Sequence, residues 1–206
     1  MLARIVAENW LTARAVIGLY PARGENEDIV LYTDESRSTE AARWVGLRQQ
    51  HKQPKGRFNV ALADYVGGKD YVGAFAVTAG HGIDTRVAEF EATHDDYSAI
   101  MLKSLADRLA EAAAEWLHLQ VRQKYWGYAS EEVLTNDALI AEQYKGIRPA
   151  PGYPACPDHT AKREIFALLD APNTAGMNLT ESCAMTPAAS VSGFYIAHPA
   201  SAYFAI

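Results

Sequence analysis

Residues 95–126, DDYSAIMLKSLADRLAEAAAEWLHLQVRQKYW, contain the strongest structural signal in the sequence. A spacing of three or four residues separates the apolar positions Tyr97, Met101, Leu105, Leu109, Ala112, Trp116 and Leu119. This period predicts one long amphipathic helix. Asp95 is expected to cap its N-terminus, and Gly127 is expected to end it. At about 1.5 Å per residue the helix would be roughly 45 Å long, enough to form the spine of a domain.

Short runs of β-branched and aromatic residues predict strands on the N-terminal side of this helix. Residues 15–20 and 29–32 are expected to form two strands joined by a polar turn at 24–28. Further strands are expected at 58–63 and at 72–78, the second closed by Gly80-His81-Gly82. Between them, residues 39–52 are compatible with a helix that ends before Pro54.

The C-terminal third of the chain mixes helical and strand-like patterns. Helices are expected at 136–143, capped by Thr135 or Asn136, and at 158–169, whereas residues 178–206 alternate like strands. There is no regular βαβ rhythm and no internal repeat. The sequence therefore predicts an α+β fold with a largely antiparallel sheet.

Composition limits the classes of protein to which the chain can belong. Its 206 residues fit one domain, and 49% hydrophobic with 21% charged residues is typical of a globular protein. The net charge of −6 argues against a general nucleic-acid binder. No apolar run approaches the roughly 20 residues that span a bilayer. We therefore expect no membrane partner. Two cysteines cannot form a disulfide framework, which favours a reducing compartment, so the sequence predicts a cytoplasmic protein.

The segment 148–157, RPAPGYPACP, contains four prolines in its last nine residues and is predicted to be a rigid extended loop. Prolines hold side chains in place at low entropic cost, which suits ligand binding. Arg148 can donate two parallel hydrogen bonds to a carboxylate. Tyr153 offers a flat face beside Gly152, where the backbone can approach a ligand closely. The alternative is a surface loop whose arginine pairs with a neighbouring acid.

A polar line runs along the long helix at Lys103, Asp107, Glu111 and Glu115, each four residues from the last. A solvated face with a Lys103–Asp107 pair is the default interpretation. The functional alternative is that one carboxylate points into a cleft. Helical periodicity does not distinguish the two interpretations.

Known catalytic and metal-binding motifs are missing from the sequence. The six histidines do not form a metal-binding pattern, and Cys156 with His159 is a single Cys-x-x-His pair, so no metal site is expected. Neither a dinucleotide fingerprint, a phosphate loop nor a nucleophile elbow occurs. A self-contained hydrolase or dehydrogenase cannot be assembled from these residues.

One local segment is basic although the whole chain is acidic. Between Ala41 and Ala63 there is no acid, while five cations accumulate: Arg43, Arg48, Lys52, Lys55 and Arg57. Such a surface could steer an acidic partner toward the protein. Equally, the segment could be basic by coincidence.

Residues 146–160, GIRPAPGYPACPDHT, resemble the signature loop of the activation domain of cobalamin-dependent methionine synthases. The match is long and unusual in composition. Further matching segments lie on both sides of it: 70–78 (DYVGAFAVT), 94–97 (HDDY), 105–112 (LADRLAEA), 125–128 (YWGY) and 190–193 (SVSG). The likeness covers nearly everything from Val16 to Ile206.

The resemblance implies a single C-shaped, helmet-like α+β domain with a twisted, mostly antiparallel sheet and a long central helix. It implies S-adenosylmethionine as ligand and reductive remethylation of cob(II)alamin as function, with the cobalamin held by a neighbouring module. A flavodoxin-like protein or a reductase would donate the electron. The family domain extends beyond both ends, so the chain is expected to be truncated at each end and to lack a complete active site.

The resemblance also implies roles for individual residues in binding S-adenosylmethionine. Arg148 matches an arginine that contacts the ligand carboxylate, and Glu111 matches a helix carboxylate that would meet the ligand ammonium. Tyr203 and Phe204 fall where the family has two tyrosines beside the adenosyl group, so Phe204 departs by one hydroxyl. The loop residues Ala150 and Gly152 belong to the same expected site.

Two residues are expected to face cobalamin and its module. Tyr153 fits a tyrosine that faces the corrin, and Asp107 fits an aspartate that meets a histidine of the cobalamin module. Other departures from the family pattern are Ala161 for Glu, Thr186 for Trp, and Ala200 and Ala202 for polar residues. An interaction module that kept the fold and lost the ligand is the alternative function.

Overall fold

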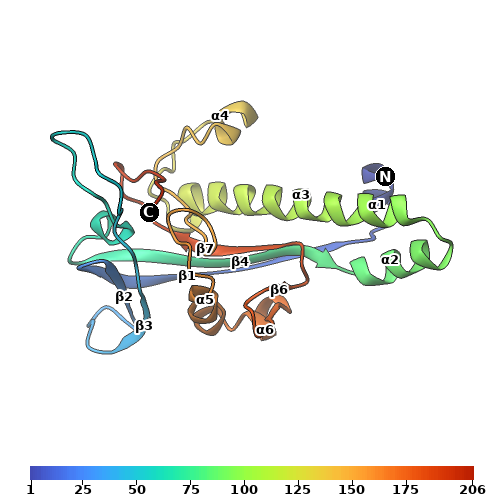
Figure 1. Ribbon diagram of the computed structural model, residues 1–206, viewed down its shortest axis with the longest axis horizontal. Helices are drawn as coiled ribbons and strands as arrows, with labels where there is room; N and C mark the ends of the chain where they lie inside the picture. The colour runs from blue at the N-terminus through green and yellow to red at the C-terminus, as the bar shows by residue number, and fades with distance from the viewer.

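The computed structural model describes residues 1–206. Its centre is a five-stranded sheet in which every pair of neighbouring strands is antiparallel. The strand order is β3 (Glu40–Trp44), β2 (Asp28–Tyr32), β1 (Thr12–Glu25), β4 (Asp70–His81) and β7 (Ser190–Tyr195). The longest strands, β1 and β4, pair over most of their length and form the axis of the sheet (Figure 1).

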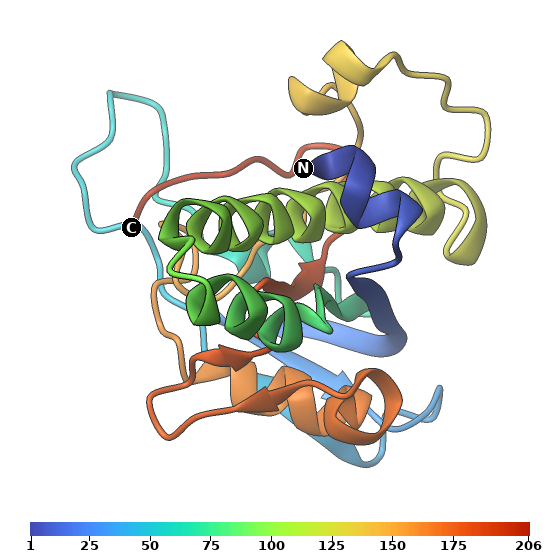
Figure 2. The ribbon, with the colours of Figure 1, turned by 90° about the vertical axis from the view of Figure 1, so that its right-hand side faces the viewer.

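Helices cover both faces of the sheet (Figure 1). On one face lies α3 (Asp96–Gln120), which continues as a π-helical turn, η2 (Val121–Tyr125). Near its N-terminal end lie α1 (Leu2–Ala7) and α2 (Ile83–Ala92), as Figure 2 shows. The opposite face carries α5 (Ala161–Leu169), α6 (Ala171–Ala175) and the two-stranded ribbon of β5 (Asn178–Leu179) and β6 (Met185–Thr186). No helix combines the length and apolarity needed to cross a membrane.

Strand β4 is the centre of the hydrophobic core because it is buried on both faces. Its side chains alternate between two clusters, since successive residues of a strand point to opposite sides. Val72, Ala74 and Ala76 join the cluster on the α5 and α6 side, whereas Phe75 and Val77 join the cluster beneath α3. A strand covered on both faces reads as a continuous apolar run, as residues 71–79 do.

The long helix is confirmed at its ends but not on the face that its large apolar residues suggest. Asp95 caps α3 by accepting a hydrogen bond from the Ser98 backbone N–H at 3.0 Å, and Gly127 follows the π turn with a φ of 77°. Tyr97 and Trp116, however, are 72% and 59% exposed. The buried stripe consists mostly of small residues: Ala99, Leu102, Ala106, Ala110, Ala114 and Leu117. Alanine side chains are short, so the backbone of α3 can lie close to the sheet. The helix therefore buries its alanine face rather than the face with the largest apolar side chains.

Two sequence predictions between β2 and β4 are wrong. Residues 39–52 do not form a helix, because residues 40–44 pair with β2 as strand β3 and bury Ala42 and Trp44 on one side. Long-range pairing overrides local helix propensity here. Residues 58–63 do not form a strand. Phe58 is 90% exposed, and the 3-10 helix η1 (Leu62–Tyr65) begins within the predicted range.

The remaining elements agree in type with the sequence predictions but are shorter or longer. β1, β2 and β4 contain the predicted strands, and α5 occupies the second part of the predicted helix 158–169. Helix α4 (Asn136–Ile140) is capped by Thr135 and ends three residues early. Only the segments β5, β6 and β7 of the tail are strands, and residues 197–206 form none. The predicted α+β class with an antiparallel sheet and a long helix is confirmed.

Candidate functional site

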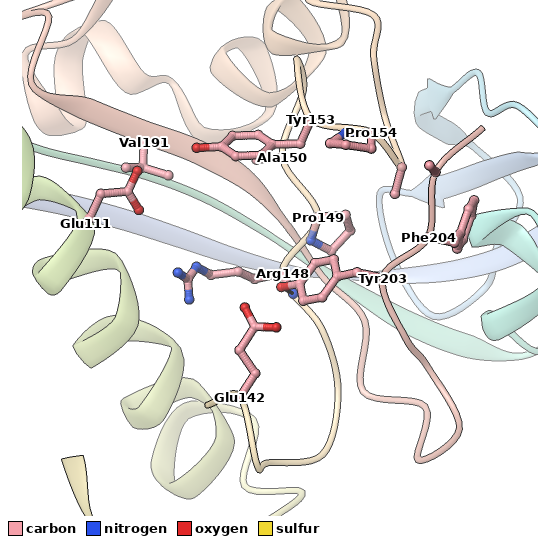
Figure 3. A pocket seen from close by; sticks show the side chains of 12 residues that line it. Glu111, Glu142, Arg148, Pro149, Ala150, Tyr153, Pro154, Val191, Tyr203 and Phe204 are labelled. Carbon is pink, nitrogen blue, oxygen red and sulfur yellow. Dashed lines mark hydrogen bonds between the residues drawn. The ribbon is translucent and has the colours of Figure 1, made fainter. Parts of the chain in front are cut away.

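A cavity of about 510 Å³ opens between the C-terminal half of α3, the proline-rich loop and the C-terminal tail (Figure 3). Three regions of the sequence that lie far apart therefore meet in one place. Twelve residues line it: Glu111, Glu142, Arg148, Pro149, Ala150, Tyr153, Pro154, Ala155, Val191, Tyr203, Phe204 and Ala205.

The proline-rich loop is fixed to the edge of β7 by backbone hydrogen bonds. The N–H of Phe194 donates to the carbonyl of Pro149 at 2.9 Å, and Ile147 and Ile196 exchange two such bonds. Within the loop, Gly152 has a φ of 98°, and a Cβ there would collide with the ring of His159. Only glycine fits this position. The predicted rigidity therefore rests on hydrogen bonds as well as on proline.

Arg148 reaches from this loop into the cavity and bonds a carboxylate of α3. Its Nη1 lies 2.7 Å from Oε2 of Glu115, and its side chain is only 15% exposed. Its backbone N–H donates to the hydroxyl of Tyr203 at 2.9 Å. Burial by itself would lower the pKa of Arg148, but the charge of Glu115 and the nearby tyrosines raise that pKa above its ordinary value. The guanidinium is therefore a permanent positive charge in the cavity wall.

Two carboxylates in the cavity wall have no partner in the protein. Figure 3 shows the guanidinium of Arg148 between Glu111 of α3 and Glu142, which follows α4. Neither of these glutamate side chains makes a hydrogen bond or an ion pair with the protein, whereas Arg148 is already matched by Glu115. The cavity therefore suits a ligand that carries one carboxylate and a larger positive charge.

Aromatic residues of the C-terminal tail form the other end of the cavity. Tyr203 is held through its hydroxyl by Arg148, and Phe204 packs against the hydrophobic core beside it. The tail is tied down further on, where the Ile206 N–H donates to the carbonyl of Pro154 at 3.3 Å. Two fixed aromatic faces next to a charged region can accommodate a flat heterocycle joined to a polar chain.

Of the eight residues expected to contact S-adenosylmethionine or cobalamin, six line this cavity: Arg148, Glu111, Ala150, Tyr153, Tyr203 and Phe204. Gly152 lines an adjoining cavity of about 170 Å³, which shares Glu111 and Tyr153 with the first. Asp107 is exposed on α3 and lines neither cavity.

The four residues of the polar line on α3 have two different environments. Lys103 and Asp107 are exposed, as a solvated face requires, but the expected pair between them is wrong, because Lys103 pairs with Glu91 at 3.5 Å. Glu111 lines the cavity and Glu115 pairs with Arg148, which is the geometry that the functional alternative requires of the second half of the line. Nothing in the sequence singled out Glu142. It lines the cavity only because α3 and the C-terminal tail, which are distant in sequence, pack beside it.

The expectation of a basic surface at residues 43–57 is partly wrong. Two of the five cations are neutralised by acids of neighbouring elements: Arg43 by Glu25, Asp28 and Glu40, and Arg48 by Glu27 and Asp64. The neutralising residues lie outside the acid-free window, so the sequence window could not show them. Lys52, Lys55 and Arg57 make no ion pair and leave a smaller basic patch on a projecting loop (Figure 2).

The two residues of the Cys-x-x-His pair have separate environments. Burial raises the pKa of the Cys156 thiol to about 11. The Nδ1 of His159 lies 2.8 Å from the ammonium of Lys162, which also donates to the carbonyl of Cys183. No group of three or more His, Cys, Asp or Glu side chains is arranged to hold a metal ion.

The chain is similar to known proteins in both sequence and structure. All of residues 1–206 match the family model "Vitamin B12 dependent methionine synthase, activation domain". The chain is also similar to the solved structure described as "Crystal Structure of the MetH Reactivation Domain bound to AdoHcy", with 53% sequence identity and a TM-score of 0.96. That match covers 100% of this chain and 64% of the solved one. The chain thus belongs to the family of vitamin B12-dependent methionine synthase activation domains.

Proposed function

We propose that this chain binds S-adenosylmethionine in the cavity of Figure 3 and supports the reductive remethylation of cob(II)alamin held by a cobalamin-binding module. The observation that carries the proposal is the charge pattern of the cavity, with one guanidinium, two unpaired carboxylates and two aromatic faces. In S-adenosylmethionine the carboxylate complements the guanidinium, the ammonium and the sulfonium complement the two carboxylates, and the purine complements the aromatic faces. A related solved domain at 53% identity holds AdoHcy.

The amino-acid part of the ligand is assigned to the charged end of the cavity. Arg148 would donate hydrogen bonds to the ligand carboxylate. Glu111 and Glu142 would lie near the ammonium and the sulfonium, since opposite charges attract more strongly in a partly shielded site than in water. At the other end, Tyr203 and Phe204 would pack against the adenosyl group.

The residues of this chain would bind and orient the ligand rather than act as acids or bases. S-adenosylmethionine supplies the methyl group, and cobalamin supplies the metal that receives it. Tyr153 is 56% exposed at the rim of the cavity, where it would cover the ligand and contact the corrin. Asp107 lies one helical turn from Glu111 and is exposed, and there it would meet a module docked over the cavity.

Calorimetry with S-adenosylmethionine tests the proposal and separates it from a ligand-free interaction module. We expect saturable one-to-one binding of S-adenosylmethionine, and displacement of it by S-adenosylhomocysteine. Adenosine alone should bind more weakly, because it lacks every group assigned to Arg148, Glu111 and Glu142. A chain that gives no heat and no thermal shift with either full-length ligand would be the interaction module instead.

Methyl transfer by the chain alone is expected to be undetectable. The sequence has no Asp-x-His-x-x-Gly element to supply a lower cobalt ligand, and the reacting carbon and cobalt must be held a few ångströms apart by a second module. The measurement is the absorbance of methylcobalamin after cob(II)alamin, S-adenosylmethionine and a strong reductant are mixed with the chain. The rate should equal the protein-free rate, and a cobalamin module should raise it. Methylation well above the protein-free rate by the chain alone would contradict this division of labour.

The patch of Lys52, Lys55 and Arg57 is expected to speed the docking of a flavodoxin-like electron donor. The double variant Lys52→Glu/Lys55→Glu should associate with an acidic donor more slowly, and the rate should depend less on salt. Stopped-flow association at two ionic strengths measures both effects. The control is Lys103→Glu/Arg108→Glu, which changes the net charge equally on exposed positions of α3. Equal slowing by both variants would show that only net charge matters.

A further inference from the structure

Four charges of alternating sign lead from the buried end of α3 to the cavity. Glu132 lies 2.9 Å from Nε of Arg122, whose Nη1 lies 3.9 Å from one oxygen of Glu115. The other oxygen of Glu115 lies 2.7 Å from Nη1 of Arg148. Arg122 is fully buried and the other three side chains are 10–22% exposed. Arg148 is thus the outer end of a shielded network.

Glu115 is held in place from several sides. The hydroxyl of Tyr144 donates to the same oxygen that contacts Arg148, at 3.3 Å. The guanidinium of Arg122 lies 3.9 Å from the centre of the Tyr144 ring, so these two residues also fix each other. Because α3 and its π turn carry Glu115 and Arg122, the network rests on a rigid element.

The contact with Glu115 occupies only one part of the Arg148 guanidinium. An arginine side chain has five N–H donors, and Glu115 is bonded through Nη1 alone. Nε and Nη2 have no hydrogen-bond partner in the protein, and Arg148 lines the cavity, so these donors are available to a ligand. A guanidinium anchored at one nitrogen keeps its remaining donors in a fixed direction.

We infer that Glu115 is a positioning residue that orients Arg148 toward the carboxylate of the ligand. This inference rests on the proposed function. Without Glu115 the long arginine side chain would have to be ordered when the ligand binds, which lowers affinity. The effect should be confined to ligands that have an amino-acid part, because the adenosyl end lies against Tyr203 and Phe204.

The test compares two ligands that differ only in that part. S-adenosylhomocysteine and 5′-methylthioadenosine share the adenosyl group and a thioether, but only the first has a carboxylate and an ammonium. By calorimetry, Glu115→Gln should weaken S-adenosylhomocysteine binding about three- to tenfold. Binding of 5′-methylthioadenosine should stay unchanged. The matched control is Glu89→Gln, which removes an equally short surface ion pair with Arg86 and should change neither affinity.

A double-mutant cycle shows whether Glu115 acts through Arg148. In the Arg148→Ala background, Glu115→Gln should have no further effect on S-adenosylhomocysteine. Equal losses for both ligands, an undiminished loss in that background, or unchanged affinity would each overturn the positioning role. If the wild type binds neither ligand, the proposed function itself fails, which is a separate result.

A second variant covers the case in which Glu115→Gln does not fold. Tyr144→Phe removes one donor to Glu115 and keeps the ring beneath Arg122. It should weaken S-adenosylhomocysteine about twofold or slightly more and leave 5′-methylthioadenosine unchanged. Identical changes for the two ligands would again contradict the inference.

Discussion

Replacing Arg148 by alanine is expected to weaken the binding of S-adenosylmethionine about ten- to a hundredfold. A charge-assisted contact with the ligand carboxylate is worth roughly 1.5–3 kcal/mol, which corresponds to that range. The effect should be large because the guanidinium is 15% exposed and its pKa lies above the ordinary value, so it stays charged at every accessible pH. Calorimetry measures the dissociation constant directly.

Two further variants make the Arg148 result specific. Arg148→Lys should recover only part of the affinity, because an ammonium is a point charge and cannot form the two parallel bonds of a guanidinium. Arg43→Ala is the matched control, since it removes an ion-paired arginine on β3 that does not line the cavity. Unchanged affinity in Arg148→Ala would remove this residue from the site. A loss equal to that of Arg43→Ala would point to a general charge effect.

Replacing Arg122 by methionine is expected to lower the free energy of unfolding by about 3–5 kcal/mol. The variant leaves Glu132, which is only 10% exposed, without its partner at 2.9 Å, and it removes a cation from the face of Tyr144. For a domain of this size the melting temperature should fall by roughly 6–20 °C. Denaturant unfolding followed by circular dichroism measures the loss.

The reason for the Arg122 effect can be isolated by removing both partners. Arg122→Met/Glu132→Leu should recover much of the stability, because an apolar pair needs no desolvation of charge. Arg43→Met, in an ion-pair network that is about a third exposed, should change the free energy of unfolding far less than Arg122→Met, because solvent screens exposed ion pairs. If the double variant is no more stable than Arg122→Met, the loss comes from packing rather than from the unpaired acid.

Features that depend only on residues close together in the sequence were predictable from the sequence alone. The ends of α3 follow from Asp95 and Gly127, because a cap needs only a side chain within three residues and a glycine that accepts a positive φ. The absence of helix and strand from the proline-rich loop likewise follows from its own residues, although its hydrogen bonds to β7 do not. Resemblance on that loop pointed to the family to which the chain belongs.

Features that depend on contacts between distant segments were decided only by the tertiary structure. Residues 40–44 became β3 because β2 offered backbone partners, although their local pattern allowed a helix. The buried face of α3 is an alanine stripe because the sheet lies close beneath it. Glu115 reaches Arg148 from α3, and Glu142 lines a cavity whose other walls come from α3 and the C-terminal tail. Burial and ion pairing depend on which segments meet in space, and local spacing along one segment contains no information about the segment on the other side.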